Sequence, residues 1–173
     1  IRDRACIVCE KPHDFGSPSI STFIVNSSIH ALGNIAREYK INIGQPYTIG
    51  ITGTNGKTTV TKLCTAILSS SFRTSSTIGN YNNEIGLPLC ALELDSKLST
   101  AIFEMGAAKS GDIDLLSKII NPSIGIITHI GHSHLEGLSS VNGVLKVKSE
   151  LIKNIKKNGI AIVPDGKYLN YWK

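Results

Sequence analysis

Residues 50–59 read Gly50-Ile51-Thr52-Gly53-Thr54-Asn55-Gly56-Lys57-Thr58-Thr59, with three glycines spaced three residues apart. The stretch follows a predicted strand at 47–52 and opens a predicted helix at 57–70, which is the setting that a phosphate-binding loop needs. The glycines let backbone N–H groups turn toward phosphate oxygens, and the helix N-terminus adds a positive partial charge. The stretch therefore predicts a phosphate-binding loop rather than a turn that only starts a helix.

The side chains of this loop suit the phosphates of a nucleotide. Lys57 can reach the terminal phosphates, and Thr58 can give its hydroxyl to Mg²⁺. The common pattern GxxxxGK followed by Ser or Thr is missed by one position, because Ile51 stands where that pattern has glycine. The residues expected to contact the nucleotide are Gly53, Thr54, Asn55, Gly56, Lys57, Thr58 and Thr59.

From Tyr47 onward, the chain alternates between strand and helix patterns. The predicted strands are 47–52, 101–104, 123–128 and 159–163, and the predicted helices are 57–70, 113–120 and 141–155. This alternation predicts an α/β fold with an open, mostly parallel sheet of the P-loop type. Ligands of such sheets bind at the carboxyl ends of the strands, where the loop, Glu104 and a group of histidines fall.

Residues 1–46 follow a different pattern. Two short strands are expected at about 5–9 and 21–25, and a helix is expected from 28 to 40, with apolar residues at helical spacing and Ser28 as its N-cap. The run Gly44-Gln45-Pro46 ends this part, so a domain boundary is placed after residue 46.

Composition excludes several classes of protein. The chain has 173 residues, 41% hydrophobic and 18% charged, which is typical of one globular domain, or of one domain with part of another. No apolar run approaches the roughly 18 residues that span a bilayer. The net charge of +5 is too small to indicate nucleic acid. Cys6 and Cys9 form a lone CxxC, which predicts packing rather than zinc or redox chemistry, in a reducing, cytoplasmic compartment.

Two further sets of polar residues fall at strand ends. Glu104 closes an apolar strand, where a carboxylate suits Mg²⁺ together with substrate phosphates; the alternative is a solvated strand terminus. His129, His132 and His134 follow the next strand with the spacing H-x-x-H-x-H. Zinc is disfavoured there because no cysteine lies near in sequence, and loop polarity is the simpler interpretation of the first two histidines.

The helix expected at 141–155 carries a lysine on its apolar side. Its apolar residues are Val141, Val144, Leu145, Leu151, Ile152 and Ile155. Lys148 lies four residues after Val144 and four before Ile152, so the helical period places it on the buried stripe. A buried lysine is costly unless it is paired, loses its proton or extends to solvent. The lysines expected on the solvated side are Lys146, Lys153 and Lys157.

Several ordered blocks of the chain resemble the Mur ligases, ATP-dependent enzymes that form amide bonds in peptidoglycan precursor synthesis. Besides the loop, the blocks are residues 77–88, 103–107 with 111–113, 133–140, and 146–150. They are most similar to the branch of the family that adds D-alanyl-D-alanine. The resemblance covers about residues 20–163, and only the phosphate loop is specific when taken by itself.

The resemblance implies roles that the residues alone leave open. The metal ligands that it implies are Thr58, Glu104, His134 and Lys148. Burial lowers the pKa of a lysine and a neutral amine can react with carbon dioxide, and Lys148 matches the family position that carries such a carbamate. Asn80 and Asn83 would approach the substrate, although asparagine is also common in turns. The catalytic residues implied are Lys57, Lys148 and His134.

The activity implied is ATP-dependent addition of D-alanyl-D-alanine to UDP-N-acetylmuramoyl-tripeptide through an acyl phosphate. The full-length enzyme is expected to be a monomer that needs ATP and Mg²⁺ and uses neither nucleic acid nor a membrane. Residues 1–46 would be the end of an N-terminal domain that binds the UDP-sugar, and residues 47–173 the first part of a central ATP-binding domain. Such a fragment is expected to be inactive by itself.

Two positions depart from the family pattern, and other functions stay open. Ala108 and His129 stand where the family usually has asparagine. Another ligase of the superfamily, such as the one that adds the third amino acid or a folylpolyglutamate synthetase, is the nearest alternative. A P-loop motor or nucleic-acid ATPase is a more distant one, and it would require a strongly basic face.

Overall fold

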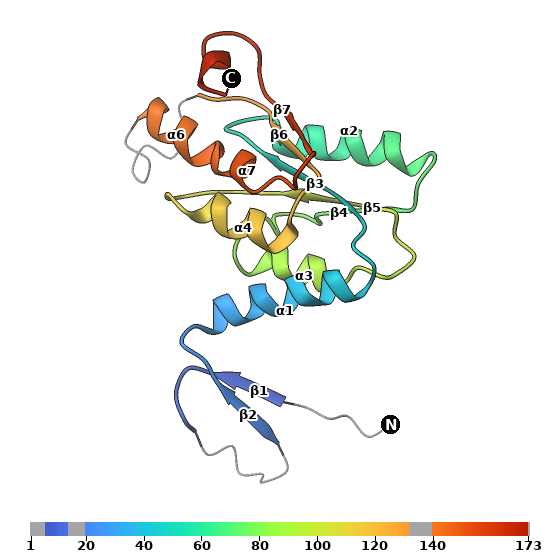
Figure 1. The fold of residues 1–173 in the computed structure, drawn as a ribbon, viewed down its shortest axis with the longest axis vertical. Coiled ribbons are helices and arrows are strands. Elements are labelled where there is room, and N and C mark those ends of the chain that lie inside the picture. Colours follow the sequence, from blue (N-terminus) through green and yellow to red (C-terminus); the bar gives the residue numbers. More distant parts are fainter. Residues whose placement is uncertain (1–5, 14–19, 132–139, 173) are drawn as a thin grey trace.

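The computed structural model describes residues 6–13, 20–131 and 140–172. They form a five-stranded parallel sheet in the order β4-β5-β3-β6-β7, and a separate two-stranded parallel sheet of β1 and β2 (Figure 1). The strands are β1 Cys6–Cys9, β2 Ser21–Ile24, β3 Tyr47–Thr52, β4 Thr74–Ser76, β5 Thr100–Glu104, β6 Ile124–Ile127 and β7 Ile160–Ile162. The helices are α1 Ser28–Asn42, α2 Lys57–Ser69, α3 Gly86–Leu92, α4 Asp112–Ile120, α6 Val141–Lys148 and α7 Glu150–Lys153, followed by a 3-10 turn at Leu169–Tyr171. The predicted α/β class with a mostly parallel sheet is confirmed.

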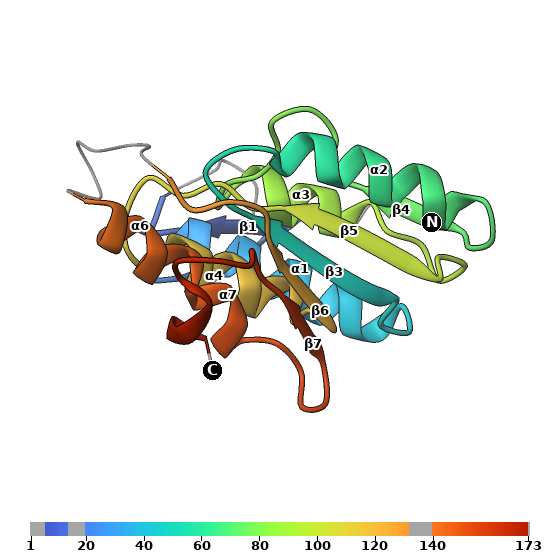
Figure 2. The same cartoon turned by 90° about the horizontal axis from the view of Figure 1, so that it is seen from above.

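Strand β3 lies at the centre of the large sheet because both of its faces are apolar or β-branched. It pairs with β5 on one side and with β6 on the other. Helix α2 covers one face, where Ile49, Ile51 and Ile102 pack in a small cluster with residues of α2. Helices α3, α4 and α7 pack on the opposite face (Figure 1), and Figure 2 gives the view onto the side that α2 covers. Since all five strands run in one direction, the loops that follow β3, β5 and β6 meet at the same edge of the sheet.

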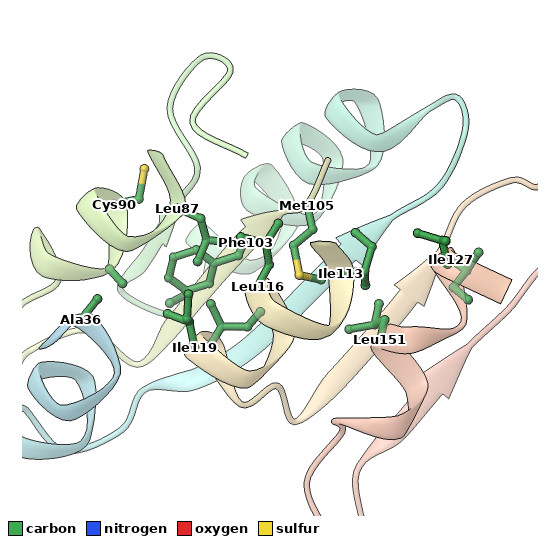
Figure 3. Packing of buried hydrophobic residues seen from close by; sticks show 14 of the residues in the cluster. Ala36, Leu87, Cys90, Phe103, Met105, Ile113, Leu116, Ile119, Ile127 and Leu151 are labelled. Atoms are coloured by element: carbon green, nitrogen blue, oxygen red, sulfur yellow. The ribbon is translucent and has the colours of Figure 1, made fainter. Parts of the chain in front are cut away.

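The main hydrophobic core lies between the sheet and the helices on that second face. Phe103 of β5 packs among Leu87 of α3 and Leu116 and Ile119 of α4, and Leu151 of α7 closes the far side (Figure 3). Along β5, Phe103 points to this core and Ile102 points to α2, as the two-residue period of a strand requires. The alternation fixes the direction of Glu104, the last residue of β5.

Helix α1 packs against α3 and α4 through small residues. Its buried residues are Gly33, Ala36 and Lys40, whereas Ile29 and Ile35 are largely exposed. A Cβ at Gly33 would lie 2.9 Å from Ile119 Cδ1, so glycine there permits the close approach of the two helices. The helix begins at Ser28, as predicted, but its N-cap is Ser27 and not Ser28: the Ser27 hydroxyl accepts a hydrogen bond from His30 N at 3.3 Å.

Three elements differ from the sequence-based expectation. The helix predicted at 141–155 is two helices, because hydrogen bonds after Ser149 change to the tighter i→i+3 pattern, as in Ile152 N to Ser149 O at 3.1 Å. Strand β4 and helix α3 were not predicted. Helix α3 begins where Asn83 Oδ1 accepts hydrogen bonds from Ile85 N and Gly86 N, at 3.1 and 2.8 Å. Within the ranges that the structure describes, no helix is long and apolar enough to cross a membrane.

Candidate functional site

The loop after β3 has a backbone that only glycine adopts easily. Gly53 has φ +147° and Gly56 has φ +81°, which L side chains rarely adopt. A Cβ at Gly53 would also collide with Thr128 Oγ1 and lie 3.0 Å from His129 N. Gly56 is the N-cap of α2 in the left-handed region, so the turn leads directly into the helix N-terminus.

The end of β6 holds the loop in place. Thr128 Oγ1 donates a hydrogen bond to Asn55 O at 2.6 Å, and Thr54 N donates to His129 O at 2.9 Å. Gly131 N donates to Thr54 Oγ1 at 3.1 Å. These hydrogen bonds to the neighbouring strand end therefore fix the loop before any ligand binds. His129 contributes to this support through its backbone, which any residue at this position could supply.

A cleft of about 330 Å³ opens beside the loop, between it, the loop after β5 and the first turn of α4. Among the residues that line it are Gly53, Thr54, Lys57, Asn82, Asp112 and Lys148. The ammonium of Lys57 donates hydrogen bonds to Gly53 O at 3.0 Å and to Thr54 O at 3.3 Å. Of the other residues expected to contact a nucleotide, Asn55, Gly56, Thr58 and Thr59 are exposed at the start of α2 and do not line this cleft.

Glu104 is buried and held on both of its carboxylate oxygens. Its side chain and backbone are only 5% exposed, so the alternative of a solvated strand terminus is wrong. Oε2 accepts a hydrogen bond from Thr58 Oγ1 at 2.8 Å, and Oε1 accepts one from Asn82 Nδ2 at 2.9 Å. A carboxylate and a hydroxyl thus meet at the N-terminus of α2, next to the phosphate loop. Two hard oxygen donors in this position fit a Mg²⁺ ion that also binds substrate phosphates.

Lys148 lies on the buried stripe of α6, as the helical spacing predicted. It is only 2% exposed, whereas Lys146, Lys153 and Lys157 are exposed. The pKa of Lys148 is lowered to about 8, chiefly by burial and then by the positive charge of Lys57, while the charges of Asp112 and Glu150 act in the opposite direction. The structure therefore brings two lysines from distant parts of the chain to one cleft.

The asparagines of residues 80–83 have different surroundings. Asn83 caps α3 through its side chain and lines the cleft, whereas Asn80 is exposed and does not line it. Asn82, which was not predicted as a site residue, contacts Glu104 and also lines the cleft. Nothing in the spacing of three asparagines within four residues distinguishes them, because the direction of each depends on the turn.

Other predicted residues are only partly placed. His134, predicted as a metal ligand and catalytic residue, lies outside the described residues, and so does His132. Ala108 lines the cleft, and its backbone N–H donates to Asp112 Oδ2 at 2.9 Å. Asp112 itself lines the cleft and was not predicted as a site residue. Within 6–13, 20–131 and 140–172, no three His, Cys, Asp or Glu side chains gather as a metal-binding group.

Replacing Asn82 with alanine is expected to weaken binding of Mg²⁺ and nucleotide about tenfold in the full-length protein. The change removes one hydrogen bond to a buried carboxylate, a bond of about 1.5–3 kcal/mol, and leaves Glu104 free to turn away from Thr58. Titration calorimetry with Mg²⁺ and ATP would measure the effect. Asn80→Ala is the matched control, since Asn80 lies outside the cleft; equal affinities for the two variants would contradict the role of Asn82.

Comparison with known proteins gives one consistent answer. Residues 51–173 match the family model of the Mur ligase middle domain. UDP-N-acetylmuramoyl-tripeptide–D-alanyl-D-alanine ligase of Bacillus subtilis is 39% identical over 142 residues, covering 82% of this chain and 31% of the relative. The Escherichia coli enzyme of that name is 32% identical over 157 residues, covering 91% of this chain and 34% of the relative. The chain thus spans about a third of the length of these relatives.

Solved structures agree with these relatives. MurF from Acinetobacter baumannii superposes with a TM-score of 0.86 at 35% identity, covering 92% of this chain and 34% of that one. MurF from Thermotoga maritima, in complex with ADP, gives a TM-score of 0.84 at 33% identity, covering 92% and 36%. FolC of Escherichia coli, in complex with ADP, gives a TM-score of 0.55 at 14% identity, which indicates a shared fold alone.

Proposed function

Because this chain belongs to the Mur ligase family, we propose that it is the phosphate-binding part of a ligase that joins D-alanyl-D-alanine to UDP-N-acetylmuramoyl-tripeptide, using ATP. The observation that supports this most directly is the single cleft in which the phosphate loop, Lys57 and Lys148 meet. Relatives of 32 to 41% identity carry the name of this ligase, and the similar structure from Thermotoga maritima holds ADP.

The reaction proposed has two steps. ATP transfers its terminal phosphoryl group to the carboxylate of the tripeptide, which gives an acyl phosphate and ADP. The amine of D-alanyl-D-alanine then attacks the acyl carbon, phosphate leaves with the C–O electron pair, and the amine loses a proton as the amide forms. In such a transfer, the protein positions the groups and stabilises the negative charge on the phosphoryl oxygens.

The residues of this chain have separate tasks in that scheme. The backbone N–H groups of residues 53–57 would hold the phosphates of ATP, and the Lys57 ammonium would lie against the terminal one. Glu104 and Thr58 would hold one Mg²⁺, which neutralises phosphate charge when bound. Lys148, once carbamylated, would be anionic and would hold a second Mg²⁺ together with His134. Asn82 keeps Glu104 in its orientation.

The domain assignment and the cellular setting are part of the same proposal. Residues 1–46 would end the domain that binds the UDP-sugar, and residues 47–173 would begin the central ATP-binding domain of a monomeric, cytoplasmic enzyme. The contacts of α1 with α3 and α4 would then hold the end of the first domain against the second. The chain by itself should not form the amide, since the reaction needs both substrates oriented together.

Phosphate release by the full-length protein tests the proposal. Release should require ATP, UDP-N-acetylmuramoyl-tripeptide and D-alanyl-D-alanine together, and the product should contain both peptides. Release that needs an amino acid or a folate in their place would favour another ligase of the superfamily. Release stimulated by nucleic acid would favour the ATPase alternative, and amide formed by residues 1–173 alone would contradict their assignment as a fragment.

A further inference from the structure

The carboxylate of Glu150 joins the helix that follows Lys148 to the first turn of α4. Glu150 begins α7 and is only 8% exposed. Its Oε1 accepts hydrogen bonds from Gly111 N at 2.9 Å and from Ser110 Oγ at 3.3 Å. Its Oε2 accepts one from Asp114 N at 3.0 Å. Both oxygens of one buried carboxylate are therefore used by a single helix N-terminus that lies 36 to 40 residues away in the sequence.

Helix α4 depends on this contact because it has no cap of its own. Its N-cap is Gly111, in the left-handed region at φ +91°, and glycine has no side chain to accept the first N–H groups. The nearest acid, Asp112, is turned the other way, and its Oδ2 accepts from Ala108 N and Lys109 N at 2.9 and 3.0 Å. Glu150 supplies the missing acceptors from another helix, with a negative charge at the positive end of α4.

The same first turn of α4 is a wall of the cleft. Ala108 and Asp112 line the cleft from this side, and Lys148 lines it from the end of α6. Glu150 does not line the cleft, so it acts on the reaction through the elements that it holds and through its charge, which opposes the lowering of the Lys148 pKa. Charge-assisted hydrogen bonds to a buried carboxylate are short and directional, which suits a contact that fixes one helix against another.

We propose that Glu150 is a positioning residue of the ligase reaction. By tying the first turn of α4 to the residues that follow Lys148, it holds Asp112 and Ala108 at a fixed separation from the Lys148 side chain. The separation decides how the transferred phosphoryl group meets the groups around it, and small misplacements lower the rate of such steps strongly. The inference rests on the proposed function for the identity of the reaction, but the helix contact itself does not.

Asn154 provides a matched control at the same helix junction. Its Nδ2 donates to Asp114 Oδ1 and Ser117 Oγ, both at 2.9 Å, and to Glu150 O at 3.1 Å. These contacts also join the C-terminal part of the chain to α4, but they reach the side chains of Asp114 and Ser117 and hold neither Gly111 N nor Asp114 N. Loss of Asn154 should therefore lower stability without moving the cleft wall.

The test compares Glu150→Gln, Glu150→Asp and Asn154→Ala in the full-length protein. Glutamine has the shape of glutamate but turns an NH₂ group toward a backbone N–H and removes the charge. We expect the kcat of Glu150→Gln to fall at least tenfold, with the KM for ATP changed less than threefold. Glu150→Asp, which keeps the charge, should recover part of the lost kcat. Asn154→Ala should keep kcat within twofold of the wild type, even if its Tm falls as far as that of Glu150→Gln.

Two results would overturn the proposal: a Glu150→Gln enzyme with kcat within twofold of the wild type, or an Asn154→Ala enzyme of equal Tm that loses as much kcat. Should Glu150→Gln fail to fold, the same comparison of kcat between Glu150→Asp and Asn154→Ala decides.

A wild-type protein without ligase activity would contradict the proposed function instead. Amide hydrogen exchange then tests the contact alone: exchange at Gly111 and Asp114 should accelerate in Glu150→Gln and not in Asn154→Ala, and equal rates would refute it.

Discussion

Replacing Lys57 with alanine in the full-length protein is expected to lower ligation at least about a hundredfold and to leave the thermal unfolding midpoint nearly unchanged. Among the residues that the structure describes, the ammonium hydrogen-bonds to the carbonyl groups of Gly53 and Thr54 and is not part of the hydrophobic core, so the change should remove no core packing. Toward a phosphoryl group, however, it is the cation that the loop itself supplies. Removal of one donor that stabilises developing negative charge typically costs about a hundredfold to a thousandfold in rate.

A lysine on the same helix provides the control for this prediction. Lys62 lies on the exposed side of α2, and Lys62→Ala makes the same change in net charge. Phosphate release, nucleotide affinity and thermal unfolding would be measured for both variants. Ligation by Lys57→Ala within a few-fold of the Lys62→Ala enzyme would mean that the loop after β3 is not the ATP site.

The sequence predicted the parts of the fold in which local pattern and burial agree. Strand β3 matches its predicted bounds of 47–52, because a strand buried on both faces is a continuous run of apolar and β-branched residues. Helix α3 was missed because its start depends on the side chain of Asn83 and its seven residues include Pro88, so it has little helical period. The break at Ser149 was missed because the apolar stripe continues across it.

The candidate site divides in the same way. Short-range spacing in the sequence predicted three features of the site. These are the glycines of the loop, the strand end at Glu104 and the buried position of Lys148. The contacts of Asn82 with Glu104 and of Glu150 with Gly111 join residues 22 and 39 positions apart. Such pairs follow from the packing of α4 and α7 and from the turn before α3. No local sequence pattern identifies Asn82 or Glu150. A pattern shared by the family could indicate that these residues are important, but it would not show which atoms they bind.

Burial alone does not identify Lys148 as a functional residue, because a second lysine is equally buried. Lys40 of α1 is 1% exposed, and burial, with smaller effects of Lys156 and Arg37, lowers its pKa to about 8 as well. Its Nζ lies 3.4 Å from Thr48 Oγ1, near the start of β3 and so at the opposite end of the strand from the phosphate loop. Lys148 differs in its surroundings, which are the cleft, Lys57 and two carboxylates.

Replacing Lys148 with alanine is therefore expected to reduce ligation by the full-length enzyme at least about a thousandfold. A lowered pKa leaves more of the amine neutral near pH 7.5, and a neutral amine adds carbon dioxide and releases a proton to become an anionic carbamate. The alanine variant could not form the proposed carbamate, and it would lose with it the binding of a metal charge that is worth several kcal/mol in phosphoryl transfer. Short carboxylates such as formate or acetate should enter the space that is left and restore part of the activity.

Two control variants distinguish the role of Lys148 in ligation from the general effects of losing a lysine. Lys40→Met controls for the loss of a buried lysine, and Lys146→Ala controls for the loss of one positive charge. The first removes the other buried lysine and the second removes an exposed lysine of the same helix, α6; both should ligate at rates near that of the wild type, and added formate should change neither. Mass spectrometry under carbon dioxide and a crystal structure with bound nucleotide would test the carbamate on Lys148 directly. Normal turnover by Lys148→Ala, or an unmodified ammonium at Lys148 in the nucleotide complex, would refute the assignment, because the buried amine would then have to act as a cation beside Lys57.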